Sequence, residues 1–265
     1  MGLMIPFVKA HGYGNDFLYV ERAHAGERLS SDLARDMCDR HRGVGADGLI
    51  VYARTEDGAE MGLWNADGSA AEVSGNGVRG LAALLLRETE SLNAVVSIRT
   101  DAGVKQLTRT DRFALRQTFR AAMGQPAGLQ VVSIDMGAET VSAVVLNMGN
   151  PQCVVLGPLP DDNRFHQLSA ALEHHAMFPA GTNVAFAEVE TPGRVVVRVW
   201  ERGCGATLSS GTGSCAALVA AASFGAADRS ADVVAPGGAQ RVDWVTDGVY
   251  LTGWAEIVAE GQWLR

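Results

Sequence analysis

The chain has 265 residues, of which 47% are hydrophobic and 20% charged. This composition is typical of a globular protein, and the length allows one large or two medium domains. The formal net charge of −8 argues against a nucleic-acid or anionic-membrane surface. No apolar run approaches the roughly 18 residues of a membrane span, and the first residues do not resemble a leader. We therefore expect a cytoplasmic protein that binds a small molecule and contacts neither nucleic acid nor membrane, and we allow a homodimer.

The four cysteines show no Cys-x-x-Cys pair and no metal-ligand spacing; they are Cys38, Cys153, Cys204 and Cys215. This pattern favours reduced thiols and argues against a disulfide framework or a zinc site. We expect no bound metal. Cys204 and Cys215 are predicted to be structural, because cysteine is often a small buried hydrophobic residue.

Short β-branched segments bounded by Gly or Asn predict strands. In chain order they are 17–21, 48–52, 95–99, 131–136, 141–146 and 195–200. A later strand-like segment, 249–258, is a candidate to close either half of the chain.

Four segments predict helices. Residues 78–88 and 214–224 are rich in Ala and Leu and apolar almost all round, so each is expected to be a buried helix. Shorter amphipathic helices are predicted at 29–42 and 166–178.

The sequence repeats itself once. Ser74-Gly-Asn-Gly and Ser210-Gly-Thr-Gly are 136 residues apart, and each follows a Trp by ten positions. Asp47 and Asn183 also differ by 136 positions, and Asn15 and Asn150 by 135. Matches in one order at one offset indicate two homologous lobes. The alternative is two strand-rich halves that share common turn residues.

These patterns predict an α/β (α+β) fold of two pseudo-symmetric lobes. Each lobe is expected to consist of many strands wrapped around one central helix. The expected domains are 1–122, with about 255–265 as a candidate closing segment, and 123–254. The boundary is placed in the Gly- and Pro-containing stretch 123–128.

Both Ser-Gly-x-Gly segments lie at the expected start of a central helix. Glycine lets backbone N–H groups approach a ligand, and a helix N-terminus offers unpaired donors with a positive dipole end. If the lobes pack about a pseudo-twofold axis, both helix starts hold one carboxylate in a cleft, and Ser74 and Ser210 face one carbon from opposite sides. That geometry suits two-base proton transfer. The alternative is that both serines are simply N-caps.

Residues 75–80 also match the dinucleotide pattern Gly-x-Gly-x-x-Gly. The residues before them do not read as a buried strand, so the βαβ unit that the pattern requires is missing. We expect no nicotinamide or flavin cofactor.

Over essentially its whole length, the chain resembles the diaminopimelate epimerase family of cofactor-independent amino-acid racemases and epimerases. The motifs that carry the resemblance are Lys9-x-His-Gly-x-Gly-Asn-Asp-Phe, Arg42-Gly-Val-Gly-Ala-Asp-Gly, Asn65-Ala-Asp-Gly-Ser, Gly75-Asn-Gly-Val-Arg, Met148-Gly-Asn-Pro, Thr182-Asn-Val, Trp200-Glu-Arg-Gly and Ser210-Gly-Thr-Gly. The resemblance implies a pseudo-symmetric two-lobed α/β fold, in which each lobe is a barrel-like, mostly antiparallel sheet wrapped around a central helix. It also implies the conversion of LL- to meso-diaminopimelate for lysine and peptidoglycan synthesis.

The resemblance also implies roles for individual residues. The reacting carboxylate of the substrate would be held by Gly75, Asn76, Gly211 and Thr212. The distal amino-acid end would be held by Asn15, Asn65, Asn150, Asn183, Glu201 and Arg202. These types are suitable, because Arg grips a carboxylate, Glu balances an ammonium and amides supply directional hydrogen bonds.

The chain departs from the family at the residues of the reaction itself. The family's base and acid are two cysteines, and their positions here hold Ser74 and Ser210. Gln152 replaces the usual His after Asn-Pro, and Ala206 replaces the usual Glu before the second loop. The pKa of an alcohol lies roughly 7 units above that of a thiol, which is near 8.5, and this gap is on the order of 10 kcal/mol. A helix dipole supplies only about 0.3–2 kcal/mol.

Three hypotheses follow. In the first, the protein is an epimerase in which Ser74 and Ser210 act through a different arrangement, relayed by Gln152, Glu201 or water. In the second, the fold performs an isomerisation or dehydration, or acts on another amino acid. In the third, the chain binds a diamino acid without converting it, or its two catalytic positions have been changed from Cys to Ser.

Overall fold

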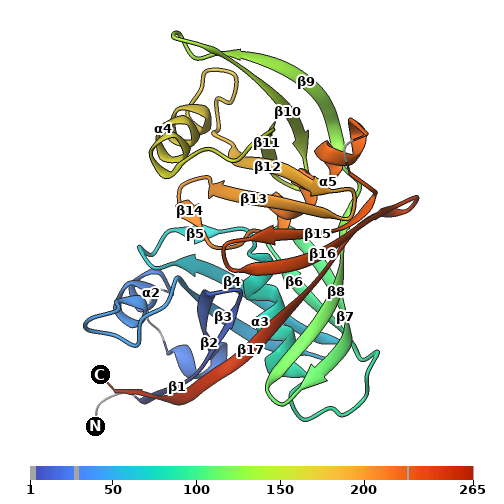
Figure 1. Cartoon of the computed structure of the whole chain (residues 1–265). Helices are drawn as coiled ribbons and strands as arrows, with labels where there is room; N and C mark the ends of the chain where they lie inside the picture. Colours follow the sequence, from blue (N-terminus) through green and yellow to red (C-terminus); the bar gives the residue numbers. More distant parts are fainter. Residues whose placement is uncertain (1–3, 27–29, 226, 265) are drawn as a thin grey trace. The chain divides into compact units, whose positions relative to one another are not determined.

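The computed structural model describes residues 4–26, 30–225 and 227–264. The chain forms two compact units (Figure 1). Unit 1 comprises Met1–Ala121 and Gly253–Arg265, and unit 2 comprises Ala122–Thr252. Two strands run from one unit into the other: β8 (Arg116–Gly124) and β17 (Gly248–Leu264).

Unit 1 is a sheet around a central helix, α3 (Gly75–Leu85). Its strands neighbour one another in the order β17, β1, β2, β3, β4, β6, β7, β8, and pairing of β8 with β17 closes the sheet. The pairs β2·β3 and β4·β6 are parallel, and the others with a known register are antiparallel. The strands are β1 (Met4–Gly12), β2 (Asn15–Glu21), β3 (Gly48–Thr55), β4 (Gly58–Asn65), β6 (Val95–Thr100) and β7 (Gly103–Phe113), with the short β5 (Ala70–Ala71) beside β4.

Unit 2 repeats this pairing scheme around α5 (Gly211–Ser223). Its order is β9, β10, β11, β12, β13, β15, β16, β17, again with two parallel pairs, β11·β12 and β13·β15. The strands are β9 (Ala127–Asp135), β10 (Thr140–Asn147), β11 (Pro151–Leu156), β12 (Asn183–Thr191), β13 (Arg194–Glu201), β15 (Ser230–Ala235) and β16 (Gly238–Val245), with β14 (Gly205–Thr207) beside β13. The matching order confirms the predicted fold class and the internal repeat.

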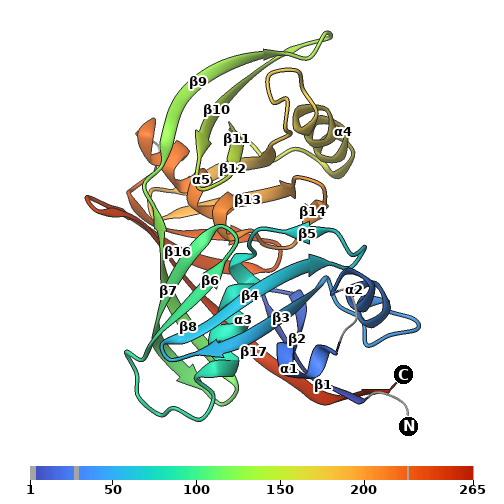
Figure 2. The same ribbon diagram turned by 180° about the vertical axis from the view of Figure 1, so that it is seen from behind.

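The strands of unit 1 alternate between two apolar layers. Phe17 and Tyr19 of β2 pack with α3, whereas Leu18 and Val20 pack with α2 (Ser30–Cys38) on the other face. This follows from the period of two in a strand and explains why β2 is buried on both faces. Figure 2 shows α2 and the four-residue α1 (Arg22–Ala25) outside the strands. In unit 2, α4 (Asp162–Glu173) covers the corresponding outer face.

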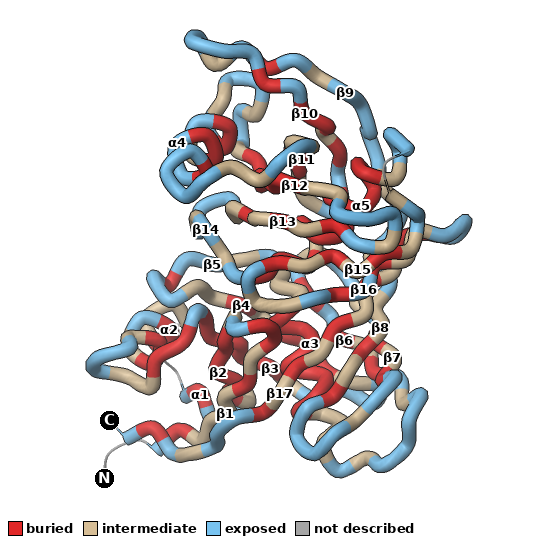
Figure 3. The backbone as a smooth tube through the Cα atoms, in the orientation of Figure 1, coloured by how far each residue is buried: buried red, intermediate tan, exposed pale blue. Residues whose placement is uncertain are grey.

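Both central helices are buried, as predicted, and the tube through α3 is red in Figure 3. Each begins three residues earlier than expected, at Gly75 and Gly211, because Ser74 and Ser210 are N-caps rather than loop residues. An N-cap side chain satisfies one of the orphan N–H groups, so the helix can start directly after it.

The expected bounds of the amphipathic helices were wrong. Helix α2 ends at Cys38 because the Asp39 carboxylate accepts the N–H groups of His41 and Arg42 and makes a turn. Helix α4 starts earlier than predicted, since Asp161 caps it through the Arg164 N–H at 2.8 Å. Residue 29, the expected start of the first helix, lies outside the described residues.

A buried arginine anchors the C-terminal end of α3. Arg109 is fully buried, and its guanidinium donates to the carbonyls of Leu86 (3.0 Å), Thr89 (2.6 Å) and Ser91. It also donates to Gln117 Oε1 at 2.9 Å, while Gln117 Nε2 donates to the Ala83 carbonyl. A cation at this end of a helix interacts favourably with the dipole.

Candidate functional site

The serine N-caps have the same geometry in both units. Ser74 Oγ accepts a hydrogen bond from the Gly77 N–H, and Ser210 Oγ accepts one from the Gly213 N–H, each at 3.2 Å. A Cβ on Gly77 would lie 2.8 Å from Ile50, and one on Gly213 3.1 Å from Val199. A side chain at either position would therefore crowd the strand residue packed against it. The N-cap role considered from the sequence is confirmed for both serines.

In unit 1, two of the predicted binding residues touch. Asn76 Nδ2 donates to Asn15 Oδ1 at 3.2 Å, and Asn15 Nδ2 donates to Asp47 Oδ2 at 2.8 Å. At the other end, the Arg79 guanidinium donates to Asn76 Oδ1. A continuous hydrogen-bonded chain therefore runs from Arg79 through Asn76 and Asn15 to Asp47; we call it the amide chain.

A charged cluster holds the Asp47 end of the amide chain. Arg40 bridges Asp16 and Asp47 at 2.8 Å each, and Lys9 pairs with Asp16 at 2.9 Å. Burial raises the pKa of the Asp16 carboxyl, but hydrogen bonds and charges from Arg40 and Lys9 outweigh burial, so this pKa lies below its usual value. The hydrogen bond from Arg40 to Asp16 raises the pKa of the guanidinium. The Asp16 carboxyl therefore stays ionised near neutral pH.

In unit 2, the equivalent positions also meet. Asn150 Nδ2 lies 3.4 Å from Thr212 Oγ1, and Gln152 Nε2 donates to Asn150 Oδ1 (2.7 Å) and Thr212 Oγ1 (3.2 Å). Gln152 is 1% exposed, and its Oε1 has no hydrogen-bond partner among the residues that the structure describes. An unsatisfied buried acceptor costs roughly 1–3 kcal/mol, so this oxygen is suited to a donor supplied by a ligand or water.

Other predicted residues hydrogen-bond to backbone groups or to a side chain of the same turn. Asn183 Nδ2 donates to the Pro151 carbonyl at 2.9 Å, and its Oδ1 accepts the Arg202 N–H at 3.0 Å. Arg202 is exposed and donates to the Ala180 carbonyl at 3.1 Å. Asn65 Nδ2 donates to Ser69 Oγ at 3.0 Å within the turn after β4. Asn183 therefore fixes the strand ends around it, and Glu201 lies partly buried at the end of β13.

Sequence reasoning gave no role to Arg79 or Asp47, although both lie in quoted motifs. For Asp47, the available signal was its correspondence with Asn183 in the internal repeat. Both residues hold neighbouring segments of the chain in place through side-chain hydrogen bonds. The burial expected for Cys204 was wrong, since this residue is exposed in the turn after β13, whereas Cys215 is buried in α5 as expected.

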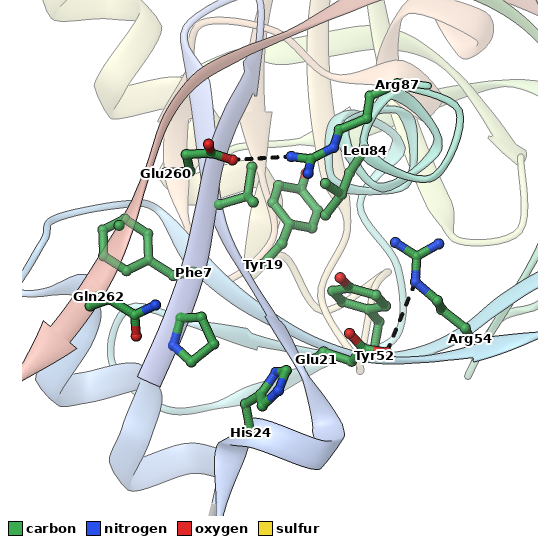
Figure 4. Close-up of a pocket in the computed structure, with 13 residues that line it drawn as sticks. Phe7, Tyr19, Glu21, His24, Tyr52, Arg54, Leu84, Arg87, Glu260 and Gln262 are labelled. Atoms are coloured by element: carbon green, nitrogen blue, oxygen red, sulfur yellow. Dashed lines mark hydrogen bonds and ion pairs between the residues drawn. The ribbon is translucent and has the colours of Figure 1, made fainter. Parts of the chain in front are cut away.

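A pocket of about 430 Å³ lies elsewhere in unit 1 (Figure 4). Its charged side chains are already paired: Arg87 with Glu260 at 3.0 Å and Arg54 with Glu21 at 3.9 Å. None of the predicted site residues lines it. The pocket is therefore separate from the helix N-termini.

The described part of the chain forms neither a cluster of metal-ligand side chains nor a membrane-spanning helix. Among residues 4–26, 30–225 and 227–264, no group of three His, Cys, Asp or Glu side chains is arranged to hold a metal ion. Within the same ranges, no helix has the length and apolar character needed to cross a membrane.

The comparisons with known proteins agree on the family. The family model described as diaminopimelate epimerase matches residues 7–127 and 144–258. The diaminopimelate epimerase of Desulforudis audaxviator is 39% identical, covering 98% of this chain and all of that protein. The chloroplastic diaminopimelate epimerase of Oryza sativa subsp. japonica is 37% identical, covering 97% of this chain and 79% of that protein.

Solved structures share the fold at low identity. A hydroxyproline epimerase from Agrobacterium vitis, with bound trans-4-hydroxy-L-proline, has a TM-score of 0.75 and 16% identity, covering 99% of this chain and 93% of that one. A methylitaconate-delta-isomerase has a TM-score of 0.68 and 13% identity, covering 98% and 95%. With the sequence matches at full length, these findings show that the chain belongs to the diaminopimelate epimerase family.

Proposed function

We propose that the protein is an isomerase that interconverts LL- and meso-diaminopimelate by proton transfer at the α-carbon, without a cofactor. Membership of the family supports the reaction, and the observation that carries the site is the pair of equivalent helix N-termini. In each unit, a glycine-flanked turn starts a buried helix, and a serine oxygen lies at its N-cap. Such N-termini bind anions through free N–H groups and the helix dipole.

The proposed binding roles divide the substrate between its two ends. The N–H groups at Gly75, Asn76, Gly211 and Thr212 bind the carboxylate of the reacting carbon. The distal end is bound by Asn15, Asn65, Asn150, Asn183, Glu201 and Arg202. For Asn183, the role is to position the Arg202 backbone through the bond at 3.0 Å.

The reaction breaks the Cα–H bond, leaves its electron pair delocalised into the carboxylate, and forms a new Cα–H bond on the opposite face. Backbone donors aimed at the carboxylate stabilise the charge that develops on it. We assign one direction of proton transfer to Ser74 and the other to Ser210. A serine hydroxyl can donate a proton to the carbanion, but it must first lose its own proton to act as a base.

A second candidate is a family member that binds diaminopimelate without inverting it. It is favoured by the environment of the two serines. Among the described residues, the hydrogen bonds to Ser74 Oγ and Ser210 Oγ come from backbone N–H groups, which cannot accept the serine proton. The amide of Gln152 and the methyl group of Ala206 are likewise unable to serve as bases.

The deciding experiment is incubation with LL-diaminopimelate in D₂O. Stereoinversion with deuterium at Cα supports the epimerase, and loss of exchange in Ser74→Ala or Ser210→Ala assigns each serine. Thermal stabilisation by the amino acid without exchange supports the binding protein. Absence of both effects rejects diaminopimelate as the ligand. The proposed cytoplasmic location and homodimer are tested by cell fractionation and sedimentation.

A further inference from the structure

The amide chain of unit 1 has opposite charges at its two ends. Arg79 is 2% exposed and donates to Asn76 Oδ1, and Asp47 accepts from Asn15 Nδ2 at 2.8 Å. A guanidinium only donates and a carboxylate only accepts. Each end therefore dictates which way the neighbouring amide points. The two amides can satisfy both ends only with every carbonyl directed toward Arg79 and every NH₂ toward Asp47.

This direction determines what the two asparagines can offer to a ligand. Both side-chain carbonyls are directed toward Arg79 and already accept one hydrogen bond, Asn76 Oδ1 from Arg79 and Asn15 Oδ1 from Asn76. Each NH₂ group uses one N–H within the chain and keeps a second one. An asparagine normally offers both a donor and an acceptor. Here the pair is biased toward donation, as a carboxylate requires.

The surroundings of Arg79 make the direction rigid. Its guanidinium carbon lies 5.7 Å from the centre of the Tyr13 ring, and a Cβ on Gly253 would lie 3.3 Å from that carbon. A Cβ on Gly12 would lie 3.0 Å from Asn76 Oδ1. Arg79 also lies in the first turns of α3, where its charge adds to the positive end of the dipole. The same residue therefore orients the amides and raises the positive potential beside the helix start.

We propose that Arg79 and Asp47 are positioning residues that orient Asn76 and Asn15 as N–H donors. This orientation makes the part of the site in unit 1 selective for carboxylate groups. The selectivity rests on the proposed function, whereas the orientation does not depend on it. Neither residue needs to touch the substrate. We expect this part of the site to bind a carboxylate more tightly than a carboxamide of the same shape.

Side-chain amide signals of the ligand-free protein test the orientation. In ¹⁵N–¹H spectra of asparagine-labelled protein, with Asn15 and Asn76 assigned through Asn→Asp variants, Arg79→Met and Asp47→Asn are expected to shift both amides. Arg79→Lys, which keeps a donor, is expected to restore most of the wild-type pattern. The controls are Arg109→Lys, at the other end of α3, and Asp39→Asn, in a separate turn; they leave both signals in place. Asp47 is partly exposed, so its variant remains informative if Arg79→Met does not fold.

Calorimetry then tests selectivity. The wild type is expected to bind diaminopimelate more tightly than its monocarboxamides, and both variants should reduce that preference at least tenfold. Unshifted amide signals in both variants, or shifted signals with an unchanged acid-to-amide ratio, overturn the inference. Shifted signals in a protein that binds no diaminopimelate support the orientation and reject the proposed function, so the two failures are distinguishable.

Discussion

Replacing both N-cap serines by cysteine is expected to accelerate exchange at the α-carbon. The Ser74→Cys, Ser210→Cys protein keeps an atom that can accept the N–H bond from Gly77 or Gly213, at the same two helix starts. The helix dipole and this N–H act on oxygen and sulfur alike, so most of their contribution cancels in the comparison. What remains is the intrinsic acidity of an alcohol compared with that of a thiol.

The size of the effect follows from that acidity. The pKa of an alcohol lies roughly 7 units above that of a thiol, so near pH 8 the fraction in the basic form rises by about 10⁷. The thiolate is a weaker base than the alkoxide and therefore less reactive toward the Cα proton. With a Brønsted coefficient of about 0.5, this lower reactivity offsets roughly half of the pKa difference. The net expectation is an acceleration on the order of 10³. Ser210 is 2% exposed whereas Ser74 is half-buried, so Ser74→Cys should ionise more readily than Ser210→Cys.

The assay follows deuterium incorporation and the LL-to-meso ratio by NMR, with thiolate content measured by iodoacetamide labelling. The matched control is Ser209→Cys, which adds a buried thiol one residue away, at a serine whose Oγ accepts from Gln240 instead of capping a helix. If the double variant labels at both positions, binds diaminopimelate and still exchanges no faster than wild type, the assignment of the two serine positions to proton transfer is wrong.

Three further predictions concern stability and reactivity. Arg109→Met should destabilise unit 1 by about 3–5 kcal/mol, because it leaves buried carbonyls and Gln117 Oε1 unpaired; a melting temperature no lower than that of the exposed-site control Arg99→Met would contradict this. The Asp16 carboxyl, with its lowered pKa, contributes stability that is present above its unfolded value near 3.8 and is lost as pH falls through the folded value. Asp16→Asn should therefore flatten the acid limb of a urea-stability profile, and an unchanged limb would refute the role of the cluster. Burial raises the pKa of the Cys38 and Cys153 thiols to about 12, and Cys215 is fully buried, so iodoacetamide should label only Cys204 in the native protein; labelling that persists in Cys204→Ser would show the core to be more accessible than described.

The sequence was most informative where a segment consists of an almost continuous run of apolar residues. The apolar run after Ser210 predicted a buried helix, and the β-branched runs predicted the inner strands, such as β3 and β13. It was less informative for β7, whose polar residues alternate with few buried ones and resemble a loop. Helix bounds depended on single side chains, Ser74, Ser210 and Asp161, that a window of apolar residues does not weigh.

For the site, the repeat predicted which residues correspond but not how they are bonded. Asn15 and Asn150 occupy equivalent positions, yet Asn15 accepts from Asn76 whereas Asn150 faces Thr212 with its NH₂ group. That difference arises from the side chains around them, an arginine in one unit and a glutamine in the other. Such orientation is a tertiary property, because the partners are distant in sequence. It cannot be obtained from spacing alone.

The composition of α5 affects how unit 2 folds and how it opens to solvent. Residues 215–221 are fully buried, and five of these seven helical side chains are no larger than cysteine. A 13-residue helix is marginal by itself in water, and this one has no exposed face on which charge pairs could support it. It therefore forms only as the surrounding strands assemble, and its amide hydrogens should exchange with solvent only when the whole unit opens. The N-terminal end of α5, which we propose binds the substrate carboxylate, is thus as durable as the unit itself. A destabilising substitution far out in the strands would shorten the lifetime of this site without altering a single contact within it.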